Sequence, residues 1–253
     1  MTSLIEDAKG ACIAAHDVGA FALASVRHIG YALRRQKLLF KQFYEVGNRS
    51  LLIVGVFGLF VGLILVLYGG DQLRRFGQEK YIGLTGLAIV WEFGPVFTAF
   101  ILAGRIGSSY AAEIGTMRVS EEIDALQAMG IRPEAYLATP RLLACALLLP
   151  VLVVYADFAA LLGGAGMAWF YVHVAPREFF RLFFQYLEFQ EIARSLAKSF
   201  LFGAIIATIG CYHGFRTTGG AEGVGRSTTA SVVHGLLAVL VADYFISRIL
   251  LVL

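Results

Sequence analysis

Hydrophobic positions along this chain form long continuous runs, whereas a soluble domain shows alternating or one-sided patterns. Residues 51–70 contain no charged side chain, and a helix needs about 20 apolar residues to cross a hydrocarbon layer of roughly 30 Å. Four more runs contain at most one Asp, Glu, Lys or Arg each, at 81–104, 142–175, 199–215 and 227–247. The pattern predicts an all-α integral membrane protein with about five transmembrane helices.

The third run is too long for one straight crossing. A helix over residues 142–175 would extend on the order of 50 Å at 1.5 Å per residue. It must therefore tilt, project beyond the bilayer, or break at the small residues 163–166. The sequence leaves these three alternatives open.

An amphipathic N-terminal region at 1–46 is expected to precede the transmembrane domain at 47–253. Its apolar residues recur at helical spacing in a segment too polar to cross a membrane; they are Val18, Phe21, Ala22, Ile29 and Leu33. Such a helix either lies in the membrane interface or packs on the helix bundle. Thirteen of the 21 Lys and Arg residues fall on the same side as the N-terminus, which favours a cytoplasmic N-terminus. Because no secretory signal pattern is found, we expect this N-terminus to be retained.

A short helix is predicted at 120–129, between the second and third runs. Ser120 is placed to cap it, acidic residues favour its first turn, and Gly130 and Pro133 end it. It is too short to span a membrane, and its apolar stripe could dock into a groove on a soluble partner. Resting on the bilayer is the alternative, which the acidic residues disfavour because cytosolic headgroups are anionic. The residues expected to couple to the partner are Val119, Glu121, Glu122, Ile123, Asp124 and Leu126.

Glu92 is the most informative charged residue, because it lies near the middle of the second run beside a helix-breaking proline. Pro95 lacks the N–H that would otherwise bond to the carbonyl of Trp91. An unpaired acceptor beside a carboxylate suits a polar headgroup, a cation or a lysine. The alternative is a protonated Glu92 that links two helices through a hydrogen bond.

Three more charged residues belong to the apolar runs or their ends. Lys198 could be the counter-charge of Glu92, or it could extend to the membrane interface. For Asp243 we favour a local ion pair with Arg248, and we interpret Asp157 in the same way.

Composition excludes several classes of protein. The chain is 58% hydrophobic and 15% charged, and its net charge of +3 is too small to indicate a nucleic-acid partner. The five histidines have no metal-ligand spacing, so no metal is predicted. Residues 220–227 have the glycine spacing of a phosphate-binding loop, but Arg226 replaces its lysine and no strand precedes it. We therefore expect no catalytic residue and no cofactor in this chain, and nucleotide hydrolysis on another polypeptide. Cys12, Cys145 and Cys211 are expected to be packing residues rather than disulfides.

These motifs resemble the MlaE/YrbE family of permease subunits from ABC-type lipid transporters associated with MCE proteins. The resemblance extends from about Tyr44 to the C-terminus, and one departure is Trp91, where family members often have Arg. The matching segments are Glu92-Phe93-Gly94-Pro95, Ala103-Gly104-Arg105, 112–119, 122–126, Met129-Gly130, Thr139-Pro140-Arg141, Ala156-Asp157, Gly163-Gly164, Lys198-Ser199 and 226–229.

The resemblance implies a phospholipid transporter of the bacterial inner membrane that maintains outer-membrane lipid asymmetry. Two copies would form the transmembrane core, with 120–129 as the coupling helix for a cytosolic MlaF-like ATPase that binds ATP and Mg. A small MlaB-like STAS-domain protein and a hexameric periplasmic MlaD-like MCE protein would complete the assembly. Glu92, Pro95, Lys198 and Asp243 would lie on the lipid pathway. The alternative function is an ion- or proton-coupled secondary transporter that uses Glu92.

Overall fold

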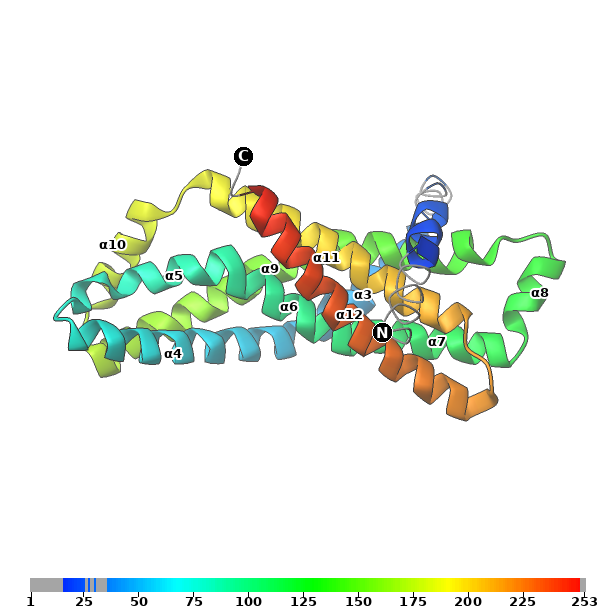
Figure 1. Cartoon of the computed structure of the whole chain (residues 1–253), viewed down its shortest axis with the longest axis horizontal. Helices are drawn as coiled ribbons and strands as arrows, with labels where there is room; N and C mark the ends of the chain where they lie inside the picture. The colour runs from blue at the N-terminus through cyan, green and yellow to red at the C-terminus, as the bar shows by residue number, and fades with distance from the viewer. Residues whose placement is uncertain (1–15, 26, 28–29, 31–35, 251–253) are drawn as a thin grey trace, which may run out of the picture. The chain divides into compact units, whose positions relative to one another are not determined.

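The computed structural model describes residues 16–25, 27, 30 and 36–250. Within this part of the chain every regular element is a helix and none is a strand, which confirms the predicted all-α class. The ribbon in Figure 1 shows long helices joined by short connections.

Five helical stretches of the described chain are long and apolar enough to cross a membrane, which confirms the predicted number. They are Gln36–Arg75, Glu79–Val119, Glu134–Val172, Phe189–Phe215 and Gly220–Ile249. The first contains α3 (Gln36–Val46), η1 (Asn48–Ser50) and α4 (Leu51–Arg75); the second contains η2 (Glu79–Leu84), α5 (Thr85–Ala88), η3 (Ile89–Phe93), α6 (Gly94–Leu102), η4 (Ala103–Gly107) and α7 (Ser108–Val119). The third contains η5 (Glu134–Ala138), α9 (Thr139–Met167) and η6 (Ala168–Val172), and the last two are α11 (Phe189–Phe215) and α12 (Gly220–Leu250).

Two short helices connect these stretches. The first is α8 (Glu122–Ala128), in the predicted position between the second and third stretches. The second is α10 (Pro176–Tyr186), which begins with proline at a position where a missing N–H costs nothing. It was not predicted from the sequence, and it buries Phe179 and Phe183 on one face.

By contact density the described chain divides into two compact units, which are described separately. The first unit comprises residues up to Val46, together with Leu102–Cys145 and Gly203–Ala238. The second comprises Gly47–Ile101, Ala146–Phe202 and the chain from Val239 onward.

In the first unit, the helix at residues 16–25 packs on the end of α11. The ring of Phe21 lies 6.2 Å from that of Tyr212 and 5.6 Å from that of Phe215. Arg216 donates a hydrogen bond of 2.8 Å to Asp17. These contacts support packing on the bundle, while Ile29 and Leu33 lie outside the described residues. Cys145 and Cys211 are buried and free in this unit, as predicted, and Cys12 is not described.

In the second unit, glycines let α4 and α9 approach closely (Figure 1). A Cβ atom on Gly58 would lie 2.6 Å from the carbonyl oxygen of Ala156, and one on Gly62 would overlap the carbonyl of Ala160. On α9, Gly163 faces the carbonyl of Leu59 in the same way. The helix runs without interruption through 163–166, so these small residues do not break the third span, and Gly163 serves close packing.

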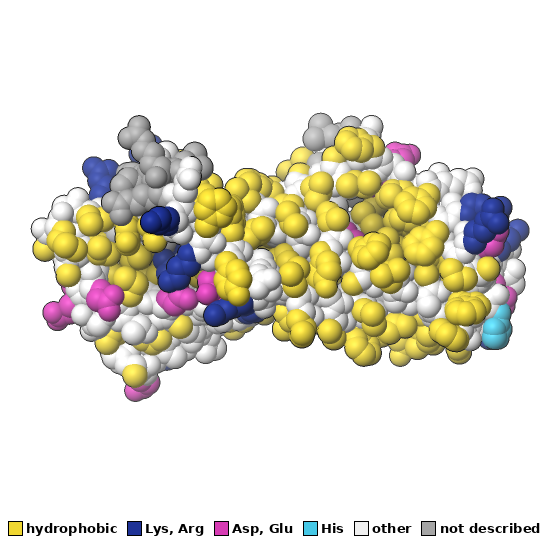
Figure 2. Space-filling model, turned by 180° about the vertical axis from the view of Figure 1, so that it is seen from behind, with side chains coloured by type: hydrophobic (Ala, Val, Ile, Leu, Met, Phe, Trp, Pro, Cys, Tyr) yellow, Lys and Arg dark blue, Asp and Glu magenta, His cyan; other side chains and the backbone are white. Residues whose placement is uncertain are grey.

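Apolar side chains cover wide areas of the face shown in Figure 2, with few charged groups among them. Large residues of α4 are exposed, among them Leu52, Phe60 and Tyr68. A soluble protein would bury most such residues. Their exposure fits helices that face lipid.

Candidate functional site

The local structure around Glu92 is a π-helical turn, η3, inside the second membrane stretch. The N–H of Gly94 bonds to the carbonyl of Ile89, five residues back. Pro95 follows in α6 and has no N–H to donate. The helix is therefore widened at this point and continues beyond it, and π turns of this kind occur frequently at functional sites.

Lys198 of α11 reaches this turn. Its Nζ donates a hydrogen bond of 2.7 Å to Glu92 Oε1 and lies 3.5 Å from the carbonyl oxygen of Trp91. The lysine is 3% exposed, so it does not extend to an interface. The structure thus brings together three groups that the sequence singled out, namely the carboxylate, the carbonyl freed by Pro95, and the lysine counter-charge.

Asp243 of α12 joins the same cluster, since its Oδ1 lies 3.4 Å from Lys198 Nζ. The predicted local pair with Arg248 is wrong. Residues five apart in a helix point in directions about 140° apart, given 3.6 residues per turn. Ser247, four residues after Asp243, lies on the same face and donates a hydrogen bond of 3.2 Å to Glu92 Oε1. Ser247 was not predicted from the sequence.

In this cluster one ammonium group lies beside two carboxyl groups. The side chains of Lys198 and Asp243 are 4% and 19% exposed, whereas that of Glu92 is 48% exposed. Buried charges are tolerated only when they are paired. Three helices therefore contribute to a polar cluster whose cation is enclosed and whose Glu92 carboxylate remains accessible.

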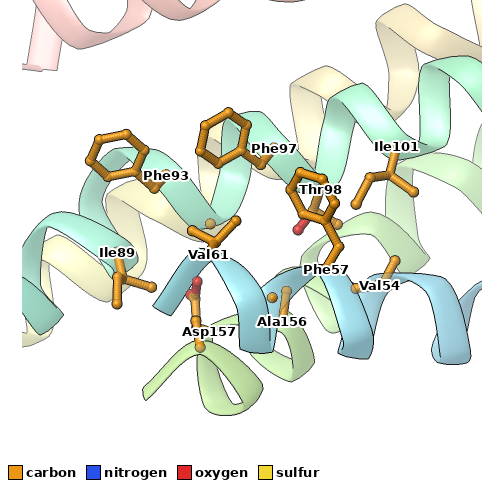
Figure 3. Close-up of a pocket in the computed structure, with 13 residues that line it drawn as sticks. Val54, Phe57, Val61, Ile89, Phe93, Phe97, Thr98, Ile101, Ala156 and Asp157 are labelled. Carbon is orange, nitrogen blue, oxygen red and sulfur yellow. The ribbon is translucent and has the colours of Figure 1, made fainter. Parts of the chain in front are cut away.

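Asp157 of α9 occupies a separate position in the second unit, facing a small pocket between α4, the second stretch and α9 (Figure 3). The residue is 7% exposed, and its Oδ1 has no hydrogen-bond partner among the described residues. The predicted local ion pair is therefore wrong for Asp157 as well. A Cβ on Gly94 would overlap this Oδ1. The cavity measures about 10 Å³, near the smallest volume that holds one water molecule.

The predicted coupling helix lies in the first unit as α8 (Glu122–Ala128), shorter than the expected 120–129. Ser120 does not cap it; its hydroxyl donates a hydrogen bond to the carbonyl of Thr116. The residue before α8 is Glu121, which has a left-handed φ of 59°.

The predicted apolar stripe of α8 divides into a buried and an exposed part. Ile123 is 2% exposed, so it attaches the helix to its own unit and is not available to a partner. It lines a groove of about 400 Å³ together with Phe21 and Arg216. Leu126 is half-buried and Val119 is 42% exposed. The accessible surface of this region is therefore formed mainly by acidic residues, namely Glu121, Glu122 and Asp124.

Two further polar contacts in the first unit were not foreseen. Arg141 of α9 donates a hydrogen bond of 2.8 Å to Glu113 of α7, which links the second and third stretches. His213 of α11 and His234 of α12 approach to 2.8 Å between ring nitrogens. Among the described residues, no group of three His, Cys, Asp or Glu side chains is arranged to hold a metal ion.

Comparison with known proteins now identifies the family. A family model described as permease MlaE matches residues 39–249, which includes Glu92, Lys198, Asp243 and α8. The chain belongs to the MlaE permease family. The match covers most of the chain, so the helices that bear the charged cluster and the short helix α8 are both parts of a MlaE permease.

Relatives of this MlaE permease include proteins named as ABC transporter permeases. A probable ABC transporter permease protein of Synechocystis is 39% identical over 82% of this chain and 79% of its own length. Another of the same description, from Rickettsia typhi, is 35% identical over 93% of both chains. The chloroplastic protein TRIGALACTOSYLDIACYLGLYCEROL 1 of Arabidopsis thaliana is 36% identical over 82% of this chain and 59% of its own length.

Proposed function

We propose that this MlaE permease is the transmembrane subunit of an ATP-driven ABC transporter that moves phospholipids between the bacterial inner membrane and a periplasmic MCE-protein carrier. The observation that carries the proposal is the cluster of Glu92, Lys198 and Asp243, in which three helices long and apolar enough to cross a membrane hold a polar site. Polar groups are expensive within a membrane and usually mark a transport pathway. A relative whose name contains that of a galactolipid also supports a lipid substrate.

In this proposal ATP and Mg bind to a separate cytosolic ATPase of the MlaF type, as the ABC transporter names of the relatives suggest. The exposed acidic residues around α8 would meet basic groups on that ATPase. The N-terminus would then be cytoplasmic. A second copy of the permease, a MlaB-like STAS-domain protein and a hexameric MlaD-like MCE protein would complete the complex, whose task would be outer-membrane lipid asymmetry.

The mechanism follows from where the second membrane stretch departs from regular α-helix. ATPase closure would push on α8, which follows directly on α7 at the end of this stretch. The π turns η3 and η4 are points where the stretch can change its hydrogen bonding without unfolding. Movement at η3 would carry Glu92 relative to Lys198 and so alter the polar cluster that the lipid headgroup passes.

The test is reconstitution of the permease with its ATPase and MCE partners in vesicles that contain a labelled phospholipid. We expect ATP-dependent transfer of the label to the MCE protein, and at least a tenfold loss of transfer in Lys198→Met. Lys80→Met is the matched control, because Lys80 is exposed and lies outside the cluster. Transfer that follows an ion gradient and ignores ATP would contradict the proposal and favour the ion-coupled alternative.

A further inference from the structure

We propose that the Glu92 cluster selects phospholipids whose headgroup carries an ammonium group with N–H donors, and that it disfavours anionic phospholipids. This inference rests on the proposed lipid-transport function and specifies its substrate. It follows from which atoms of the cluster are already occupied and which are accessible.

The cation of the cluster is not available to a lipid phosphate. A lysine ammonium group has three N–H donors, and three acceptors surround the Nζ of Lys198. They are Glu92 Oε1 at 2.7 Å, Asp243 Oδ1 at 3.4 Å and the Trp91 carbonyl oxygen at 3.5 Å. With its side chain only 4% exposed, this lysine is enclosed; it donates hydrogen bonds to Glu92 Oε1 and the Trp91 carbonyl, and Asp243 is its second ion-pair partner.

The accessible polar group of the cluster is the carboxylate of Glu92. Both hydrogen bonds that it accepts, from Lys198 and Ser247, go to Oε1. Oε2 accepts none from the residues that the structure describes, and the side chain is 48% exposed. A headgroup that reaches this site therefore meets a free carboxylate oxygen.

The charges around the site point to the same class of ligand. Lys198 is enclosed by two carboxyl groups, so the accessible part of the cluster is Glu92 and not a cation, in apolar surroundings where charges are weakly screened. An arriving ammonium group would meet the Glu92 carboxylate, whereas an anionic headgroup would meet no accessible cation. Because a carboxylate gains most from N–H donors, phosphatidylethanolamine should bind better than phosphatidylcholine, and both should bind better than phosphatidylglycerol.

Competition among lipids with identical acyl chains tests the inference. The full-length permease would be equilibrated with an equimolar mixture of phosphatidylethanolamine, its N-methyl and N,N-dimethyl derivatives, phosphatidylcholine and phosphatidylglycerol. Retained lipids would then be counted by mass spectrometry. We expect retention to fall with each added methyl group and to be about tenfold higher for phosphatidylethanolamine than for phosphatidylglycerol. That ratio equals about 1.4 kcal/mol, within reach of one charge-assisted hydrogen bond.

Two variants locate the effect. Glu92→Gln keeps the shape of the side chain and should reduce the tenfold ratio to less than about twofold. Glu79→Gln is the control, because Glu79 has a comparable side-chain exposure of 41% but pairs with Arg74 outside the cluster; its ratio should match the unmodified protein. If Glu92→Gln does not fold, the methylation series in the unmodified protein decides by itself.

The outcomes separate this inference from the proposed function. Equal retention of all five lipids, or a preference for phosphatidylglycerol, would overturn the headgroup selection and leave lipid transport standing. An unchanged ratio in folded Glu92→Gln would place the selectivity elsewhere and also overturn it. Failure of the unmodified protein to retain or transfer any of the five lipids would contradict the proposed function itself.

Discussion

Replacement of Lys198 by Met removes the one cation that the described residues contribute to the polar cluster, while keeping a long unbranched side chain. Asp243 and Glu92, 19% and 48% exposed, would then face each other without a counter-charge. Removal of one partner from a buried ion pair costs about 3–5 kcal/mol. Since Glu92 can still be hydrated, we expect the lower end, about 3 kcal/mol.

Thermal unfolding of the purified full-length protein in a neutral detergent measures this loss. Each kcal/mol shifts the Tm of a chain of this size by roughly 2–4 °C, so the Tm should fall by roughly 6–12 °C. The triple variant Lys198→Met, Glu92→Gln, Asp243→Asn removes the two unpaired charges as well, and it should recover at least half of that decrease. The control Lys80→Met should change the Tm by less than about 2 °C, as exposed substitutions usually do.

Two results would refute this account of the cluster. A Tm of Lys198→Met within about 2 °C of the unmodified protein would mean that the ammonium group does not stabilise the carboxylates. A triple variant no more stable than Lys198→Met would mean that the loss comes from packing around residue 198, because the charge repulsion would already be gone.

Three further predictions concern packing and coupling. Gly62→Ala should destabilise the protein by about 1–3 kcal/mol, because its Cβ would overlap the Ala160 carbonyl. Gly166→Ala is the control and should not destabilise it, because no atom lies within 4 Å of the added Cβ. Thermal unfolding of the two variants measures the difference. Gly94→Ala should likewise lower the Tm, and Asp157→Ala added to it should restore part of the loss, since the clash is with Asp157 Oδ1. Ile123→Asp should reduce the yield of folded permease because Ile123 is buried. Met129→Lys, at a site 66% exposed, should leave the fold intact and weaken co-purification of the ATPase, because the added cation would oppose basic groups on the partner. Equal yields of the two variants would contradict the burial.

The number of spans and the core of the charged cluster could be predicted from the sequence because both depend on local rules. A run of 20 apolar residues has few stable alternatives to a membrane helix. Pro95 identifies the carbonyl of Trp91 as unpaired through a fixed spacing of four residues. Lys198 was one candidate counter-charge for this carboxylate, with extension to the membrane interface as the alternative, and the structure shows it bonded to Glu92.

The sequence could not show which of several candidate side chains each of these residues contacts. Arg248 is close to Asp243 along the chain, but the direction of each side chain around α12 and the position of α11 decide that Asp243 meets Lys198. Ile123 was expected to dock into a groove on a partner, yet nothing in the spacing of the stripe tells whether it packs against another protein or against its own unit, where the structure buries it. The helix α10 was missed because its polar face lowers the mean hydropathy between two apolar runs.

These differences show that the contacts between helices, rather than the single charged residues, decide the chemistry of the site. A charged residue inside a span is energetically costly and so marks a candidate functional site. Its role, however, depends on which of its atoms still lack a hydrogen-bond partner once its contacts with other helices are known. From its sequence position alone, Lys198 could be interpreted as a phosphate-binding group. The structure argues against this, because Glu92, Asp243 and the Trp91 carbonyl surround its ammonium group. Glu92 is paired with Lys198, but both hydrogen bonds that it accepts from the described residues go to Oε1, which is why we propose Oε2 as the atom that a lipid headgroup would contact. The chemistry of such a site is thus set by the hydrogen-bonding atoms that remain unpaired. Which atoms these are depends on how helices from distant parts of the chain pack together.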